Sequence, residues 1–235
     1  GLGATRNNLL IQEIGRAVAR EVASTGIIWT FAPTIAVPQN NLWGRTYEGY
    51  SENTQLVTEL GKNFIIGLQG LGSNFLGDDK VLATAKHFIG DGGTDKGVDQ
   101  GNTIISESLL KDIHGMPYYA AIDSCALSIM ASFNSWNGKK LHGNKYLLND
   151  ILKNQMEFDG FIVGDWNGHG QIPGCEDSNC PEAFNAGVDI YMVPSDWEAL
   201  YWNTLSQVKS GVITEARLDD AVTRILSVKK YLGLF

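Results

Sequence analysis

The sequence lacks the features that would point to a membrane or a nucleic acid as its partner. No stretch approaches the run of about 18 apolar residues that a membrane-spanning helix needs. The 26 acidic residues outnumber the 18 Lys and Arg residues, which gives a net charge of −8, and the basic residues form no run. A polyanion finds little electrostatic attraction in such a chain. We therefore expect neither a nucleic acid nor a membrane as partner, and a neutral substrate fits better.

Patterns that bind metals or cofactors are also missing. The chain has only four His residues, and no pair of them has the His-x-His or His-x-x-x-His spacing that brings two imidazoles onto one metal ion. The glycines at 90–93 follow an apolar segment but match neither the dinucleotide-binding fingerprint nor the P-loop spacing. The sequence therefore predicts no metal site and no cofactor.

Cysteine is limited to three residues. Cys125 lies in an apolar segment, which predicts a buried free thiol. Cys175 and Cys180 flank a short polar loop, at a spacing that one disulfide can close. Two reduced loop thiols are the alternative. A disulfide is typical of an oxidising compartment, so we expect a secreted or periplasmic protein.

What the chain does contain is a regular alternation of helix-like and strand-like segments. Amphipathic spacing predicts helices over 7–24, 53–70, 106–123, 144–156, 181–187, 196–210 and 214–232, with a break near 115–117 in the third. Short apolar runs predict strands over 27–31, 82–89, 127–133, 160–164 and 188–193. A turn is predicted at Asn137-Gly138.

Five strands separated by helices imply parallel pairing through right-handed crossovers. An open doubly wound sheet and part of an eight-stranded barrel both satisfy this order. The loops after the strands are richer in glycine and polar residues than the loops before them, which favours a barrel with an active face at the carboxyl ends of its strands. The fold class is therefore α/β, a partial (β/α)8 TIM-like barrel, because a closed barrel typically needs about 250 residues.

The fourth predicted strand ends in a carboxylate beside an indole. Residues 161–163 are apolar, and Asp165-Trp166 follow where the strand opens into a loop. A sugar ring matches both side chains, since its C–H face packs on an indole and its anomeric carbon accepts a carboxylate nucleophile. The alternative is a helix N-cap Asp followed by a core Trp.

Three basic side chains follow two other predicted strands. Arg45 comes after the first strand, and Lys86 and His87 lie near the end of the second. They offer hydrogen-bond donors to hydroxyl groups. Each has a purely structural alternative: Arg45 could pair only with Glu48 or Glu52, and adjacent strand residues such as Lys86 and His87 point to opposite faces unless the strand is ending.

Other candidates carry less weight. His114 and His142 are predicted to be surface or loop residues without a role, and His169 is interpreted as a polar loop residue rather than a pocket residue. Trp43 and Trp136 are equally suited to the core and to a sugar platform.

The segments around these residues together resemble glycoside hydrolase family 3, and within it the exo-acting β-glucosidases and β-glucan glucohydrolases. The hexosaminidase branch is a poorer match, because its Asp-Ser-His loop is missing after Thr94. The matching stretches are 44–52 (GRTYEGYSE), 86–94 (KHFIGDGGT), 132–138 (SFNSWNG), 159–166 (DGFIVGDW) and 186–194 (AGVDIYMVP).

The resemblance implies a retaining mechanism in which Asp165 is the nucleophile and forms a glycosyl-enzyme. It places Arg45, Lys86 and His87 on positions that hold hydroxyls of the terminal glucose, and Trp166 on a position that grips the adjoining sugar. The expected enzyme is an O-glycosyl hydrolase (EC 3.2.1.-) that removes non-reducing terminal glucose from β-linked glucans, oligosaccharides or glucosides.

The resemblance also implies parts that this chain does not contain. The family's first barrel strands, and the C-terminal α/β sandwich domain that supplies the acid/base carboxylate, have no counterpart within 1–235. We therefore expect 1–235 to be one barrel-like domain and a fragment, with an open edge and poor activity in isolation. Phe133, Gln100 and Gln171 depart from residues of some relatives, which leaves the leaving-group preference open.

Two other functions stay open. The chain could be a sugar-binding remnant of such a domain without catalysis. It could also be a Schiff-base lyase that uses Lys86 as its amine.

Overall fold

The computed structural model describes all residues, 1–235, and is built around a parallel β-sheet. The sheet contains β1 (Ala85–Phe88), β3 (Ser128–Ala131) and β6 (Phe161–Val163) in the order β1-β3-β6. Parallel bridges add a segment on each side: Trp29 pairs with Leu82 and Thr34 with Lys86 on one edge, and Val163 pairs with Ile190 on the other. Each segment therefore lies beside its neighbour in the sequence.

The five predicted strand segments are thus adjacent and parallel, but the two outer ones are reduced. The predicted strands 27–31 and 188–193 form only isolated bridges. Both segments run into a proline, Pro33 and Pro194, which has no N–H to donate to a ladder. Each also has a sheet neighbour on one side only, to which several backbone hydrogen bonds join it, such as that from the N–H of Thr30 to Leu82 at 2.9 Å and that from the N–H of Ile190 to Ile162 at 3.1 Å.

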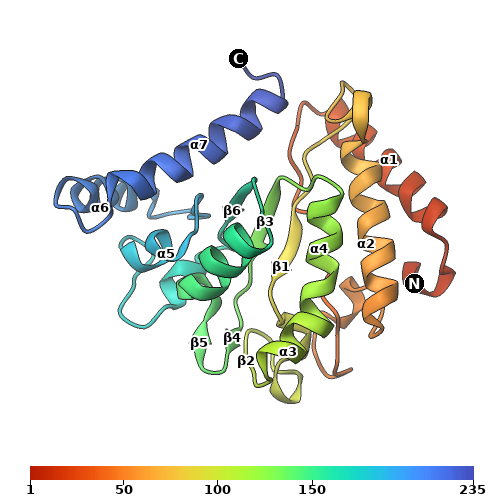
Figure 1. Cartoon of the computed structure of the whole chain (residues 1–235), viewed down its shortest axis with the longest axis horizontal. Coiled ribbons are helices and arrows are strands. Elements are labelled where there is room, and N and C mark those ends of the chain that lie inside the picture. Colours follow the sequence, from red (N-terminus) through yellow and green to blue (C-terminus); the bar gives the residue numbers. More distant parts are fainter.

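Helices cover the sheet (Figure 1), and α1, α2 and α4 lie side by side on one flank of it. The predicted break at 115–117 is wrong: a π-helical segment runs into α4 with helical dihedral angles at the junction, and Pro117 lies where the π-helical hydrogen bonding gives way to that of α4. The helices are α1 (Asn8–Ser24), α2 (Thr54–Gln69), α3 (Glu107–Leu109), α4 (Met116–Asp123), α5 (Pro181–Ala186), α6 (Trp197–Lys209) and α7 (Glu215–Tyr231), with π-helical segments at Leu110–Gly115 and Tyr146–Gln155.

The pairing of α1 with α2 depends on two glycines. A Cβ on Gly67 would lie 2.3 Å from the carbonyl oxygen of Gln12, and one on Gly15 would lie 2.6 Å from that of Phe64. The two helices therefore approach closely only because both positions lack a side chain. Asn7 and Asn53 cap the two helices, since each side chain accepts a backbone N–H of the first turn.

Alternation along the strands divides the core between the two faces of the sheet. Ile129 and Ile162 belong to the large apolar cluster shared with α1, α2 and α4. Met130, Phe161 and Val163 point to the opposite face and form a smaller cluster with residues that include Val228 of α7. Both faces of the central strands are therefore buried, as the continuous apolar runs predict.

A second, smaller sheet lies beyond the carboxyl ends of β1 and β3. It contains β2 (Asn102–Thr103), β4 (Ser135–Trp136) and β5 (Lys139–Lys140). The predicted turn joins β4 to β5, and Asn137 and Gly138 both have positive φ, 47° and 88°, as a tight hairpin requires. No helix of the structure combines the length and the apolar character needed to cross a bilayer.

Candidate active site

The candidate site forms around Asp165, in the loop directly after β6. Its Oδ1 accepts the backbone N–H of Trp166 at 2.7 Å, and its Oδ2 lies 3.6 Å from Nε2 of His87, with 14% of the side chain exposed. Trp166 is 60% exposed and the short helix that follows is preceded by Asn167 as its N-cap. The alternative of a capping Asp beside a core Trp is therefore wrong.

His87 connects this carboxylate to two other charged groups. Its Nδ1 lies 2.9 Å from Oδ2 of Asp91, and its Nε2 lies 3.1 Å from the guanidinium Nη2 of Arg45. Because a carboxylate only accepts, Nδ1 carries a proton that it donates to Asp91. The other nitrogen then faces Arg45 and Asp165. Asp91 itself is held by the N–H of Gly92, which donates to its Oδ1 at 3.0 Å.

Arg45 takes part in two contacts at once. Its Nε and Nη2 donate to the two oxygens of Glu48 at 2.7 and 2.9 Å, a bidentate pair that fixes the plane of the guanidinium. The hydrogen bond to Glu48 raises the pKa of Arg45, and the charges of Asp91 and Asp165 add to the rise. The expected surface pairing with Glu48 is therefore present, but it orients Arg45 toward His87 rather than away from the site.

The charged side chains of the site also act on the pKa of Lys86. Burial is the main cause of the lowered pKa of Lys86, and the positive charge of Arg45 lowers it further, whereas Glu48, Asp165 and Asp91 oppose the change. The pairing of β1 with β3 shifts register between Lys86 and Phe88. Strict alternation is lost at this point, so that Lys86 and His87 both lie near the acidic groups.

Two side chains that the sequence analysis did not single out also adjoin the site. Asp91 is one of them: it sits 7% exposed in the glycine-rich turn, four residues after His87. The other is His142, which was predicted to be a surface or loop residue without a role but is 1% exposed and accepts the backbone N–H of Asp165 at 2.9 Å through Nε2. His142 lacks a sequence signal, because it belongs to no periodic element.

The remaining His and Trp candidates have structural roles. His114, also predicted to be a surface or loop residue, is buried in a π-helical segment, and this burial lowers its pKa to about 4. His169 is buried and its Nε2 donates to the carbonyl oxygen of Asp177. Trp43 is 2% exposed. Trp136 is half-buried against the core, and its indole N–H bonds a loop carbonyl.

The loops around the site are tied together by Lys140. Its Nζ donates to the carbonyl oxygen of Phe133 at 2.8 Å, to that of Gln100 at 3.3 Å and to the side chain of Gln171 at 2.8 Å. The amide of Gln171 donates in turn to that of Gln100 at 2.8 Å. One ammonium thus joins the loops that follow β1, β3 and β6.

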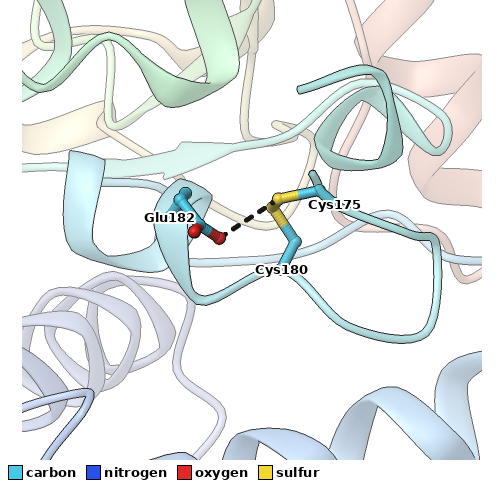
Figure 2. A group of neighbouring side chains, drawn as sticks. All are labelled: Cys175, Cys180 and Glu182. Atoms are coloured by element: carbon cyan, nitrogen blue, oxygen red, sulfur yellow. Dashed lines mark hydrogen bonds between the residues drawn. A yellow bond between two sulfur atoms is a disulfide. The ribbon is translucent and has the colours of Figure 1, made fainter. Parts of the chain in front are cut away.

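Cys175 and Cys180 form a disulfide with a Cα–Cα distance of 4.8 Å. Figure 2 shows Glu182, at the start of α5, with its carboxylate beside this bond, 3.3 Å from Sγ of Cys175. Both sulfur atoms are engaged in the disulfide, so this group offers no thiolate to a metal ion. Cys125 is exposed, not buried as predicted, because it lies in the turn after α4 with φ of 62°.

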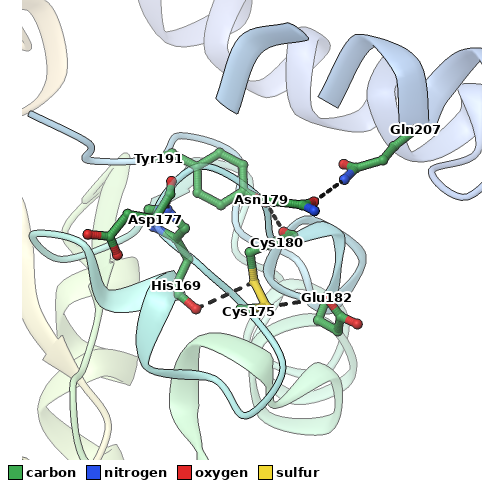
Figure 3. The surroundings of a disulfide bond; sticks show 8 residues. All are labelled: His169, Cys175, Asp177, Asn179, Cys180, Glu182, Tyr191 and Gln207. Carbon is green, nitrogen blue, oxygen red and sulfur yellow. Dashed lines mark hydrogen bonds between the residues drawn. A yellow bond between two sulfur atoms is a disulfide. The ribbon is translucent and has the colours of Figure 1, made fainter. Parts of the chain in front are cut away.

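The disulfide closes a loop that is anchored on both sides (Figure 3). The ring of His169 packs against that of Tyr191 at 4.7 Å between centroids, and the Tyr191 hydroxyl donates to the carbonyl of Cys180. Gln207 of α6 donates to the side chain of Asn179 at 2.6 Å. The loop after β6 is therefore held to the elements that follow it.

Comparison with known proteins identifies relatives over the whole chain. The profile described as "Glycosyl hydrolase family 3 N terminal domain" matches residues 1–228. A β-xylosidase of Formosa agariphila is 34% identical over 96% of this chain and 33% of its own length, and a periplasmic β-glucosidase of Salmonella typhimurium is 32% identical over 100% and 31%. The chain thus spans about a third of these curated relatives.

Solved structures are also similar to this chain over its whole length. An exo-1,3/1,4-β-glucanase from a Pseudoalteromonas species superposes with a TM-score of 0.98 at 55% identity, covering 100% of this chain and 29% of that one. A β-glucosidase from Listeria innocua, solved in complex with glucose, has a TM-score of 0.90 at 29% identity, with coverage of 100% and 33%.

Proposed function

Because the chain belongs to glycosyl hydrolase family 3, we propose that it is the catalytic part of a retaining, exo-acting β-glucosidase or exo-β-glucanase. The observation that carries the proposal is the contact between Asp165 and His87, 3.6 Å from Oδ2 to Nε2, at the carboxyl end of a parallel sheet. A partly exposed carboxylate surrounded by fixed donors is what an oxocarbenium-like transition state needs.

In the proposed reaction Asp165 attacks the anomeric carbon of the terminal glucose. The bond to the leaving oxygen breaks as the ester to Asp165 forms, and water then releases glucose with net retention. Arg45, Lys86 and His87 would donate to the glucose hydroxyls, and the exposed face of Trp166 would stack on the adjoining sugar. We assign the acid/base, which protonates the leaving oxygen, to a carboxylate outside 1–235, about 5–5.5 Å from the nucleophile.

The order of the sheet supports a barrel as the complete architecture. Five parallel segments follow one another in space as in sequence, whereas a doubly wound sheet reverses its order at a switch point. We propose that 1–235 is one domain, a partial (β/α)8 barrel. The remaining strands and the acid/base domain would correspond to the two thirds of the relatives' length that this chain does not span.

The proposed substrates are β-linked gluco-oligosaccharides, glucans or glucosides. Two relatives are named β-glucosidase and exo-1,3/1,4-β-glucanase, which supports glucose as the terminal sugar, whereas a third is named β-xylosidase. We further propose a secreted or periplasmic location, because two relatives are periplasmic enzymes and the disulfide between Cys175 and Cys180 suits an oxidising compartment.

The test is to trap the glycosyl-enzyme in the longest natural polypeptide that contains this chain. After incubation with an activated 2-deoxy-2-fluoro-β-glucoside, intact-mass and peptide analysis should find one fluoroglucosyl group, on Asp165. Saturable glucose binding without an adduct would instead identify a sugar-binding remnant. Borohydride trapping of a carbonyl substrate on Lys86 would identify a Schiff-base lyase. Either result would overturn the proposal.

A further inference from the structure

The imidazole of His142 connects the ends of two neighbouring strands. His142 lies in a short 3₁₀ segment, Leu141–Gly143, and is 1% exposed. Its Nε2 accepts the backbone N–H of Asp165 at 2.9 Å. On its other side, the main chain of Ser132 raises the pKa of the ring. Ser132 follows β3 and Asp165 lies two residues beyond β6.

These contacts fix the protonation of the ring. An Nε2 atom that accepts a hydrogen bond carries no proton, so the proton resides on Nδ1. Burial is the main cause that lowers the pKa of His142 to about 3, and the neighbouring basic side chains of His169, Lys140 and His87 lower it further. His142 is therefore a neutral acceptor across the ordinary working range of an enzyme.

The turn that carries Asp165 wraps around this ring. A Cβ on Gly168 would lie 2.3 Å from Nε2 and Cε1 of His142, and one on Gly164 would lie 3.5 Å from its Cδ2. The carbonyl of Asp165 accepts the N–H of Gly168 at 2.9 Å, which closes the turn. The loop thus leaves a space that matches an imidazole, and glycine at 168 is required for it.

His142 takes over where the sheet stops supporting this strand. The N–H of Phe161, at the start of β6, bonds the carbonyl of Leu127 on the side of β3 at 3.1 Å, and the pairing with β3 ends at Val163. The N–H of Asp165, which faces the same side by alternation, bonds His142 instead. A side chain has therefore replaced the strand ladder at the residue whose carboxylate must be aimed.

We propose that His142 is a positioning residue that holds the main chain of Asp165 so that its carboxylate points at the anomeric carbon. The inference rests on the proposed function of Asp165. His142 acts through the backbone and touches no substrate atom. Its loss should therefore slow the chemical step, with little effect on the binding of the sugar.

The experiment compares His142→Leu, which removes the acceptor, with His142→Gln, whose amide oxygen can occupy the place of Nε2. Hydrolysis of a nitrophenyl β-glucoside is measured in the longest natural polypeptide that contains this chain. For His142→Leu we expect kcat to fall roughly 10–100-fold, the effect of a displacement of about 1 Å, and KM to stay near the wild-type value. His142→Gln should recover much of kcat.

A second histidine provides the matched control. His169 is equally buried, at 1% exposed, but its Nε2 bonds the carbonyl of Asp177 and not the site. His169→Gln should lower the melting temperature without the selective loss of kcat. If His142→Leu fails to fold, Gly168→Ala, which presses on the same ring, should show the kcat loss instead.

The failure of this inference differs from the failure of the proposed function. A wild-type protein that neither hydrolyses the glucoside nor forms the fluoroglucosyl adduct removes the proposed function. An active wild type with unchanged kcat in folded His142→Leu, or in Gly168→Ala, removes the role of His142 alone. A loss in His142→Leu that His142→Gln does not relieve also counts against the acceptor.

Discussion

The imidazole of His87 lies between two carboxylates, with Nδ1 2.9 Å from Asp91 and Nε2 3.6 Å from Asp165. Arg45 approaches the same Nε2 to 3.1 Å. One buried ring therefore links the proposed nucleophile to a carboxylate behind it and to a fixed guanidinium beside it. Changes to either neighbour should reach Asp165 through His87.

Asp91→Asn tests the group behind His87. A carboxamide both donates and accepts, so it no longer requires the proton of His87 to reside on Nδ1. Loss of one charge-assisted hydrogen bond costs about 1.5–3 kcal/mol, and kcat/KM for a nitrophenyl glucoside should fall roughly 10–100-fold. Asp95→Asn, at an exposed position of the same loop, is the control. Equal activity of the two variants would contradict the role of Asp91.

Arg45→Lys tests the guanidinium beside His87. Lys keeps the charge but cannot form the bidentate pair with Glu48 and reach His87 at the same time. We expect KM to rise about tenfold or more, because a donor to the sugar is misplaced. Steady-state kinetics decide this. Arg16→Lys, a change in an exposed pair with Glu13 on α1, should leave KM unaltered, and a normal KM in Arg45→Lys would be incompatible with sugar binding by this residue.

Local signals in the sequence predicted most of the fold. The helices expected over 7–24 and 53–70 are α1 and α2, Asn8–Ser24 and Thr54–Gln69, because apolar spacing and Asn caps are encoded within a few residues. The three central strands were predicted for the same reason. The two outer segments contain only isolated bridges and no regular strand, because strand pairing depends on neighbours that local sequence patterns do not describe.

The candidate site was only partly predictable. Arg45, His87 and Asp165 were identified as candidates because each lies near or after the end of an apolar strand, and parallel strands bring their carboxyl ends together. Asp91 was given no role, although it lies only four residues after His87. His142 was missed because its position depends on a contact across the fold. His142 meets Asp165 through a loop 23 residues away in sequence, and no periodicity marks that contact. The positive φ of the turn at Cys125 likewise overrode its apolar surroundings.

The stability of the protein should decrease on acidification. Burial lowers the pKa of His114 to about 4 and that of His142 to about 3, against about 6.5 in an unfolded chain. Above pH 6.5 both states are neutral and nothing is gained or lost. Below pH 6.5 the two imidazoles are protonated in the unfolded chain but stay neutral in the folded one. The free energy of unfolding therefore decreases as the pH falls toward 4 for His114 and toward 3 for His142.

Urea unfolding between pH 7 and pH 4 measures this effect. The lowered pKa values of Glu48 and Asp220 act in the same direction. His114→Phe, which cannot titrate, should flatten the dependence between pH 6.5 and 4, compared with the exposed-loop change Asp95→Asn. A variant with an unchanged slope would mean that His114 is protonated in the folded protein.

Removal of the disulfide should affect stability rather than catalysis. The bond between Cys175 and Cys180 closes a loop of sequence separation 5, and a loop this short contributes about 2 kcal/mol through the unfolded chain. The Cys175→Ser, Cys180→Ser double variant should unfold at lower urea, and dithiothreitol should shift the wild type equally. Tyr191 and His169 still anchor the loop, so kcat should not change. A variant as stable as the oxidised wild type would refute the contribution.

The buried ion pairs of Asp189, next to β6, should contribute far more to the free energy of unfolding than the ion pairs on the surface. Oδ1 of Asp189 accepts from Lys153 at 2.7 Å and from Arg217 at 2.6 Å, while its Oδ2 accepts the N–H of Ile162 at 2.8 Å. The side chains of Asp189 and Lys153 are 0% and 1% exposed. Asp189→Asn therefore leaves a buried ammonium and guanidinium short of negative charge, and should cost about 3–5 kcal/mol of unfolding free energy.

Surface pairs provide the comparison for this loss. Arg16→Gln breaks an exposed pair with Glu13 and should cost less than about 1 kcal/mol. Denaturant curves of the two variants therefore separate by several kcal/mol if the Asp189 cluster is intact in solution, and similar curves would contradict it. Ile162 belongs to β6, the strand that leads to Asp165, so Asp189→Asn also tests whether the cluster orients the nucleophile. The kcat of the folded variant is therefore calculated per molecule of enzyme that the fluoroglucoside labels. An unchanged kcat would mean that the cluster supports the fold and not the direction of the nucleophile.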